Sequence, residues 1–300
     1  MNITYIEYLA NKLSYPEEGK ASILCDAKKV TENEKADILM QDAVDSFERT
    51  NYSFDGMSAR FDSIADAAGI HKYAAAMLML MQACETLEKK YAENGYDDKL
   101  FTDTMSDLRF KFIECKKVKN VWGTFVAFWY PGFFRMTRFA LGRFQYEKVS
   151  YSKKYTGIAG NFVKEGDTVL NFHIPSSGVS LTEEVRLDSY KKAKEFFYPD
   201  SDKPVPFVCS SWLLWPGYED CLPERSNVRA FRHDFTLVDA NESAEFGNAW
   251  RVFDSYAEKD VSEWPRDTSQ RRAFAEYTEQ GGKHGSGYGV FFFDGEKIVK

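Results

Sequence analysis

The spacing of apolar residues changes along the chain, and this change limits the possible folds more than any other feature of the sequence. Over the first 115 residues or so, apolar side chains recur every three or four positions, which is the period of an amphipathic helix. At Phe144 the spacing changes to alternation, which is the period of a strand, and predicted strands and helices then follow one another. We therefore expect an α+β or α/β fold, with a mostly helical N-terminal domain over 1–155 and a mixed-sheet α/β C-terminal domain over 156–300.

Two segments of the first half stand out. Residues 70–91 are apolar on nearly all sides at first and charged later, so we expect them to form the central helix of a bundle. The segment 121–134 is unusually aromatic, in a chain whose Phe, Tyr and Trp content is already 16%. We expect these rings to enter a large core, with some of them lining a substrate cleft.

The first predicted strand changes the parity of its apolar residues. Phe144 and Tyr146 alternate on one face, whereas Val149 and Tyr151 alternate on the other. An extra residue in the strand shifts the parity in this way, so we expect a β-bulge near Glu147–Lys148.

A strand, a helix and a second strand follow one another between 168 and 214. Residues 168–174 and 206–214 are rich in β-branched and aromatic side chains, and the segment between them has helical spacing. Ser180 and Glu183 have the spacing of a capping box, so we expect the helix to start there. Two strands joined by a helix are expected to be parallel, with a right-handed crossover.

The rest of the sequence predicts further helices and strands of the C-terminal domain. We expect a helix or helix–strand element at 227–237, a helix at 268–280, a strand at 288–293 and a hairpin turn at Asp294–Gly295. The glycine-rich run 281–289 follows a helix and precedes a strand, whereas a dinucleotide-binding fingerprint needs the opposite order. We interpret it as a flexible connection.

Charge and composition exclude several classes of protein. With 39 basic and 46 acidic residues the net charge is −7, which disfavours nucleic-acid binding. The apolar stretches are too short to span a membrane, and the N-terminus lacks the pattern of a signal peptide. Five scattered cysteines suit reduced thiols in the cytoplasm, and no His or Cys spacing predicts a metal site.

The loop after the first parallel strand is the first candidate site. Ser176, Ser177, Gly178, Val179, Ser180 and Leu181 form it. Ligands of open α/β sheets bind at the carboxyl ends of parallel strands, and backbone N–H groups near a helix start attract anions. The alternative is that the loop is simply a capped helix start after Pro175.

His173 is the second candidate. Alternation along the strand puts Asn171 and His173 on one face, with His173 next to the loop. Imidazole titrates near neutral pH, so His173 can act as a general base, or its ring can simply donate to a backbone carbonyl. A Cys–His pair with Cys209 is also conceivable if the faces of the two strands meet, although a free cysteine is more often a small buried apolar residue.

Three segments of the C-terminal half resemble a known family. They are 171–182 (NFHIPSSGVSLT), 207–214 (FVCSSWLL) and 226–231 (SNVRAF). Together they resemble bacterial acyltransferase-domain proteins with a helical N-terminal domain and a GNAT-like C-terminal domain. The loop of this chain has one glycine, whereas the usual GNAT loop reads Gln/Arg-x-x-Gly-x-Gly/Ala.

The resemblance implies a GNAT-like fold in which acyl-CoA inserts where two parallel strands separate. On this chain the pyrophosphate would lie on the loop 176–181, and a base would take the proton of an attacking amine. We assign His173 as that base and Tyr218 as the acid that protonates the thiolate. Asn171, Ser211 and Trp212 are expected to line the substrate cleft.

The sequence thus predicts a cytoplasmic N-acyltransferase that uses acyl-CoA, such as acetyl-CoA, on a small amine acceptor. A thiol-dependent hydrolase or transferase acting through Cys209 and His173 is the second hypothesis. The third is a non-catalytic binding protein on a GNAT-like fold, in which large side chains such as Trp212 or Phe172 block the gap between the two strands.

Overall fold

The computed structural model describes residues 1–299, which divide into two compact units, Met1–Phe139 and a second unit that begins at Ala140. None of the helices in this described part of the chain combines the length and apolar character that a membrane span requires. The division falls earlier than the boundary predicted after residue 155, because the strands between 138 and 150 pair with the sheet of the second unit.

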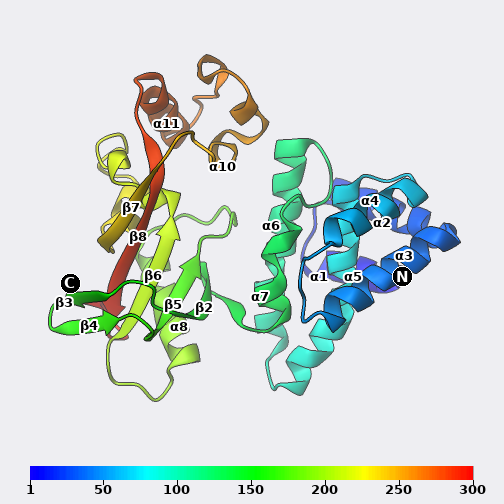
Figure 1. Cartoon of the computed structure of the whole chain (residues 1–300), viewed down its shortest axis with the longest axis horizontal. Coiled ribbons are helices and arrows are strands. Elements are labelled where there is room, and N and C mark those ends of the chain that lie inside the picture. Colours follow the sequence, from blue (N-terminus) through cyan, green and yellow to red (C-terminus); the bar gives the residue numbers. More distant parts are fainter. Residues whose placement is uncertain (300) are drawn as a thin grey trace. The chain divides into compact units, whose positions relative to one another are not determined.

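The first unit is a bundle of helices, as the spacing of its apolar residues predicts (Figure 1). Its elements are α1 (Ile3–Lys12), α2 (Glu17–Glu32), α3 (Glu34–Arg49), α4 (Met57–Ala68), α5 (Lys72–Glu93), α6 (Asp98–Lys119), the 3-10 turn η1 (Ala127–Trp129) and α7 (Pro131–Phe134). Helix α5 contacts α1, α2, α3, α4 and α6, and it buries twelve of its residues. It is therefore the central helix that its all-round apolar first half predicts.

The second unit contains a mixed sheet in the order β1-β2-β5-β6-β8-β7, with β9 paired to β8. Its strands are β1 (Arg138–Leu141), β2 (Phe144–Ser150), β5 (Thr168–His173), β6 (Val205–Ser211), β7 (Thr236–Ser243), β8 (His284–Phe293) and β9 (Ile298–Val299). The pairs β2–β5, β6–β8, β7–β8 and β8–β9 are antiparallel. Strands β5 and β6 are parallel, and α8 (Glu183–Phe197) connects them. This confirms the predicted strand–helix–strand unit.

Smaller elements complete the second unit. They are the hairpin strands β3 (Tyr155–Ile158) and β4 (Asn161–Lys164), the 3-10 turns η2 (Trp212–Leu214), η3 (Pro216–Tyr218), η4 (Asp254–Glu258) and η5 (Val261–Glu263), and the helices α9 (Asn227–Arg232), α10 (Trp250–Phe253) and α11 (Ser269–Glu279). The predicted hairpin turn near Asp294 joins β8 to β9. The predicted helix at 268–280 is α11.

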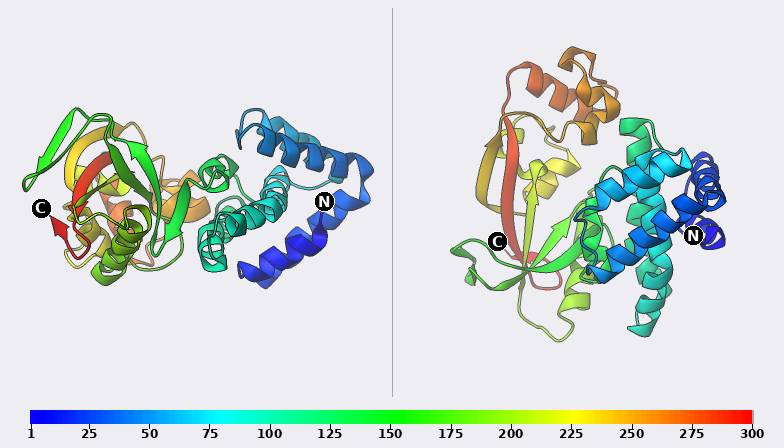
Figure 2. Two further views of the ribbon diagram at one scale, coloured as in Figure 1. Left: turned by 90° about the horizontal axis from the view of Figure 1, so that it is seen from below. Right: turned by 45° about the vertical axis from the view of Figure 1, so that its right-hand side comes forward.

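Different side chains cover the two faces of the sheet. On the face toward α8, aromatic rings pack on one another, as Phe207 does with Tyr190 at 5.7 Å between centroids and with Phe291 at 5.1 Å. On the other face, Val169 and Val208 pack in a cluster that includes side chains of the β3–β4 hairpin. The left view of Figure 2 shows α8 and this hairpin on opposite sides of the sheet.

No bulge interrupts β2 where the parity of its apolar residues changes. Its pairing with β5 is continuous from Gln145 to Ser150, so the predicted bulge is wrong. Tyr146 contacts rings on the α8 face, whereas Val149 packs on the opposite face with the hairpin cluster. The parity of the apolar residues changes because the first half of β2 is buried on the α8 face and its second half on the opposite face.

Two further local predictions are wrong. Helix α8 begins at Glu183, with Thr182 at its N-cap position and no side-chain cap, so Ser180 does not start the helix. The run 281–289 is not a flexible connection, because β8 begins at His284 and pairs with β6 and β7. A Cβ atom at Gly287 would lie 2.4 Å from the Leu214 carbonyl oxygen, so this glycine permits a close backbone approach.

Candidate functional site

The parallel strands β5 and β6 stop pairing before they end. Within residues 1–299 their register consists of two pairs, Leu170 with Phe207 and Asn171 with Val208. Strand β5 continues to His173 and β6 to Ser211 without further pairs between them. The pairing between the two strands therefore stops short of their carboxyl ends, and the carboxyl ends of parallel strands are where open α/β sheets bind ligands.

His173 lies at the end of β5 and contacts two polar side chains. Its Nε2 atom is 2.7 Å from Oε1 of Glu147 and 3.1 Å from Nδ2 of Asn171. Glu147 is the β2 partner of Asn171, so the strand register places all three side chains on one face. The His173 and Glu147 side chains are 23% and 16% exposed, which leaves the cluster within reach of a ligand.

The carboxylate of Glu147 determines what this imidazole can do. When Nε2–H donates to the carboxylate, the neutral ring carries its basic lone pair on Nδ1. Protonation of Nδ1 makes the ring cationic, and the adjacent carboxylate stabilises that cation, as in catalytic His–carboxylate pairs. The cluster can therefore serve as a general base.

Arg143 holds the loop that follows β5. Its Nε donates to the Val179 carbonyl at 2.8 Å, and its Nη1 donates to the Pro175 carbonyl at 2.9 Å. Burial lowers the pKa of the guanidinium to about 10, so it remains charged at neutral pH. Between these two anchors Gly178 takes a positive φ of 77°, a conformation that glycine adopts without strain.

A buried ion pair holds the other end of the loop. Arg186 on α8 donates to both carboxylate oxygens of Asp234 at 2.6 and 3.0 Å, and its Nη1 donates to the Leu181 carbonyl at 2.6 Å. The hydroxyl of Tyr190 donates to the same carboxylate at 3.0 Å. Arg186 and Asp234 are 3% and 6% exposed, so this pair is part of the core.

The hydroxyl of Ser180 is also engaged, since Oγ accepts from Nδ2 of Asn227 at 2.7 Å. The loop 176–181 is thus tied to α8 and α9 by Arg186 and Asn227. This explains why Ser180 does not cap α8. The loop is an ordered connection, held through two arginines that bind its carbonyl groups.

Comparison with known protein families shows which family the chain resembles. Residues 139–291, just over half of the sequence, match the GNAT-like C-terminal domain, and residues 5–136 match the N-acyltransferase N-terminal domain. The chain belongs to this family. It is therefore an acyltransferase, with a helical N-terminal region followed by a GNAT-like mixed sheet.

Solved structures of acyltransferases share the fold. Three of them are complexes with decanoyl-CoA and teicoplanin (TM-score 0.71), with CoA and 10C-teicoplanin (0.70), and, for a mutant, with octanoyl-CoA (0.69). Each is 20% identical in sequence, over 94% of this chain and 85% of the other. No curated protein matches the chain.

The predicted pair of Cys209 with His173 is wrong for this acyltransferase. The register places Phe207 opposite Leu170, and Cys209 follows two residues later on the same face, whereas His173 lies on the other face of the sheet. Cys209 is 1% exposed, and burial raises the pKa of its thiol to about 12. It is a buried apolar residue and not an activated nucleophile.

Tyr218 does not reach the His173 cluster. Its ring is completely buried among the aromatic residues of α10 and α11, and its hydroxyl lies 2.8 Å from Nδ1 of His284. Burial raises the pKa of Tyr218 and lowers the pKa of His284 to about 4, so both groups stay neutral at physiological pH. The prediction that Tyr218 is the acid is therefore wrong.

The three residues predicted to line the substrate cleft have different surroundings. Asn171 contacts His173, whereas the Ser211 hydroxyl accepts from the Leu213 amide and caps η2. The Trp212 ring packs against Phe274 at 5.4 Å, within the cluster that contains Tyr218. Within residues 1–299 no group of three His, Cys, Asp or Glu side chains is arranged to hold a metal ion.

Three residues of the site, Glu147, Arg143 and Arg186, do not follow from the sequence patterns. Glu147 falls at the position of the predicted bulge, and neither arginine belongs to a recognisable motif. Glu147 follows Tyr146, which is predicted to be buried on a strand, so alternation places Glu147 on the other face of that strand. Alternation alone does not tell whether that face is a site or is exposed to solvent. Its role depends on the pairing of β2 with β5, which a single sequence does not reveal.

Proposed function

We propose that this acyltransferase transfers an acyl group from acyl-CoA to an amine, with His173 as the general base. The observation that supports it is the His173–Glu147 pair, which lies where the parallel strands β5 and β6 stop pairing. Acyl-CoA as the donor is supported by the similar structures, which hold decanoyl-CoA, octanoyl-CoA or CoA. We propose that the amides of the loop 176–181 receive the pyrophosphate.

The proposed reaction is a direct transfer. The amine nitrogen attacks the thioester carbonyl carbon, the C–N bond forms, and the C–S bond breaks. The proton of the attacking nitrogen goes to Nδ1 of His173, and Glu147 stabilises the resulting imidazolium. The leaving group is a thiolate, and because a thiol pKa is about 8.5 it departs without a dedicated acid.

We propose that the acceptor is an amine, and an assay with acceptors of different sizes tests how large it is. One similar structure holds teicoplanin, which is not a small amine, so both small amines and teicoplanin belong in the assay. The net charge of −7 favours a cationic amine over an acidic acceptor. A blocked, non-catalytic fold is not supported, because Trp212 packs with Phe274 and Phe172 packs among the rings toward α8.

Binding of the donor is expected to raise the Tm. A ligand at 100 times its Kd stabilises the folded state by about 2.7 kcal/mol, which corresponds to several degrees. Differential scanning fluorimetry with acetyl-, octanoyl- and decanoyl-CoA measures the shift and ranks the chain lengths. If none of the three raises the Tm, the donor is not acyl-CoA.

Two matched glycine variants locate the donor on the loop. Gly178 and Gly166 both have positive φ, and a Cβ atom at either would meet nothing within 4 Å. Gly178→Ala and Gly166→Ala therefore each add backbone strain of about 1–2 kcal/mol without a clash. Only Gly178→Ala is expected to weaken acyl-CoA binding in titration calorimetry, and an equal effect of the two would remove the loop from the donor site.

Replacing Arg143 is expected to raise the KM for acyl-CoA. In Arg143→Met the carbonyls of Pro175 and Val179 lose their donor, so the loop no longer keeps its shape, and we expect a KM about tenfold higher with kcat within twofold. Arg135→Met is the control, because Arg135 also donates to a backbone carbonyl, that of Asn51, outside the loop. Steady-state kinetics of both variants decide whether Arg143 acts on donor binding.

A further inference from the structure

The helical unit contains a pocket whose lining includes none of the residues of the His173 site. Its volume is about 390 Å³, within the range of small-molecule sites. Helices α4 and α5, the connection before α4 and the segment 124–128 form its walls. Every residue that lines it belongs to the first unit, so an inference about it is independent of the proposed function.

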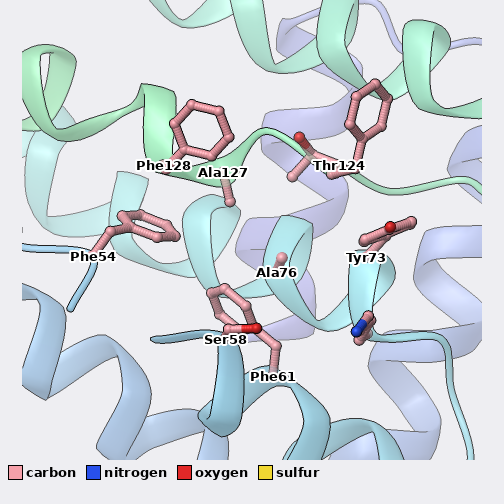
Figure 3. Close-up of a pocket in the computed structure, with 10 residues that line it drawn as sticks. Phe54, Ser58, Phe61, Tyr73, Ala76, Thr124, Ala127 and Phe128 are labelled. Carbon is pink, nitrogen blue, oxygen red and sulfur yellow. The ribbon is translucent and has the colours of Figure 1, made fainter. Parts of the chain in front are cut away.

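Small side chains create the space. Ala76 on α5 and Ala127 on η1 line the pocket and are 3% and 5% exposed, so they lie deep in it. In Figure 3, Ala76 lies between the rings of Phe54 and Phe61 at one end and Tyr73 at the other. A larger side chain at position 76 would occupy this volume.

Half of the residues that line the pocket are aromatic, and most of their rings contact one another or neighbouring rings. Phe54 packs edge-on against Phe47 at 5.5 Å between centroids and contacts Phe61 at 6.0 Å. Tyr73 contacts His71 at 4.6 Å. Rings fixed in this way favour a flat aromatic ligand, which can stack or pack edge-to-face with several of them at once.

The lining of the pocket also includes an exposed ring and a positive charge. Phe128 is 64% exposed, so its apolar surface faces water unless a ligand covers it. Lys72 is the one charged residue among those described as lining the pocket. Its Nζ lies 3.3 Å from Oδ1 of Asp62, and the two side chains are 46% and 49% exposed. A surface ion pair of this kind is weak, so the ammonium can turn to an anionic ligand at little cost.

We infer that this pocket, between Phe54, Phe61, Tyr73 and Phe128, binds an aromatic ring that carries a carboxylate, with the carboxylate on Lys72. The ring enters toward Ala76, and Phe128 covers it at the mouth. The charge selects an acid over a neutral or cationic compound of the same shape. The ring walls select an aromatic acid over a linear aliphatic one.

Titration calorimetry with three probes tests the inference: 1-naphthoate, the neutral 1-naphthamide of the same shape, and decanoate as the aliphatic acid. We expect 1-naphthoate to bind with the highest affinity. We expect Lys72→Met to weaken 1-naphthoate about fivefold and to leave 1-naphthamide unchanged. No binding of 1-naphthoate, equal affinity for 1-naphthamide, or tighter binding of decanoate each overturns the inference.

Three variants place the probe in this pocket. Ala76→Leu fills the space and is expected to abolish binding, and Phe128→Ala removes the exposed ring and is expected to weaken binding about fivefold. Ile38→Ala is the control, because Ile38 is 62% exposed on α3 and does not line the pocket. If Ala76→Leu does not fold, Phe128→Ala decides alone, since it alters an exposed side chain. Unchanged affinity in Phe128→Ala excludes the pocket.

Discussion

The variant His173→Gln is expected to lose 100- to 1,000-fold in turnover number, or about 3–4 kcal/mol of transition-state stabilisation, while it keeps its affinity for acyl-CoA. Glutamine keeps polar atoms near Glu147 and Asn171 but offers no basic nitrogen. The amine must then lose its proton to water. The loss falls on kcat because the imidazole acts on the proton that moves during the transfer and not on the donor.

A second histidine provides the matched control. His233 Nε2 lies 2.8 Å from Oε1 of Glu219, almost the same distance as in the His173–Glu147 pair. The His233 side chain is 58% exposed, and it follows α9 instead of ending β5. His233→Gln is therefore expected to leave kcat unchanged, so a His–carboxylate pair by itself does not explain a loss in His173→Gln.

The role of Glu147 separates a base from a merely structural histidine. Glu147→Gln removes the carboxylate that stabilises the imidazolium but keeps a hydrogen-bonding side chain of the same size, and we expect kcat to fall about 10- to 100-fold with little change in Tm. Release of free thiol from acyl-CoA in the presence of an amine measures the rate. Full activity in His173→Gln removes His173 as the base, and a Tm loss without a kcat loss in Glu147→Gln assigns that glutamate to stability.

The strand–helix–strand unit was predictable because its signals are local. The alternation of Val169, Asn171 and His173 on one face needs only the period of a strand, and that period is enough to place His173 beside Asn171. The same local reasoning failed at the start of α8. There the partners of the loop are Arg186 and Asn227, and the second of them is 47 residues from Ser180.

The domain boundary and Glu147 needed information that the chain does not display locally. Strand β2 belongs to the second unit because it pairs with β5, across a hairpin that separates them in sequence. That pairing also brings Glu147 beside Asn171 and His173. The prediction for Cys209 failed for the same reason. Cys209 and Phe207 lie on the same face of β6, but only the register of β6 against β5 shows that this is not the face of His173.

The second large effect is expected in the core of the GNAT-like unit. Asp234→Ala leaves the Arg186 guanidinium buried without its carboxylate, and breaking a buried pair in this way costs about 3–5 kcal/mol. Tyr190 also loses the acceptor of its hydroxyl. Chemical denaturation is expected to show this loss in the free energy of unfolding. Asp267→Ala is the control: Asp267 pairs with Arg271 at 3.1 Å but is 64% exposed, and exposed ion pairs contribute little to stability.

A double variant separates the stability of this ion pair from its effect on the loop. Replacing both partners, as in Arg186→Met with Asp234→Leu, removes the uncompensated charge, and a buried pair replaced by apolar side chains of similar size is often neutral. We therefore expect the double variant to regain most of the stability that Asp234→Ala loses. It does not regain the donor to the Leu181 carbonyl, because methionine has no N–H group in its side chain. If Arg186 positions the loop for acyl-CoA, the double variant is stable but binds acyl-CoA weakly. If the double variant recovers both stability and affinity, Arg186 contributes only to the stability of the core.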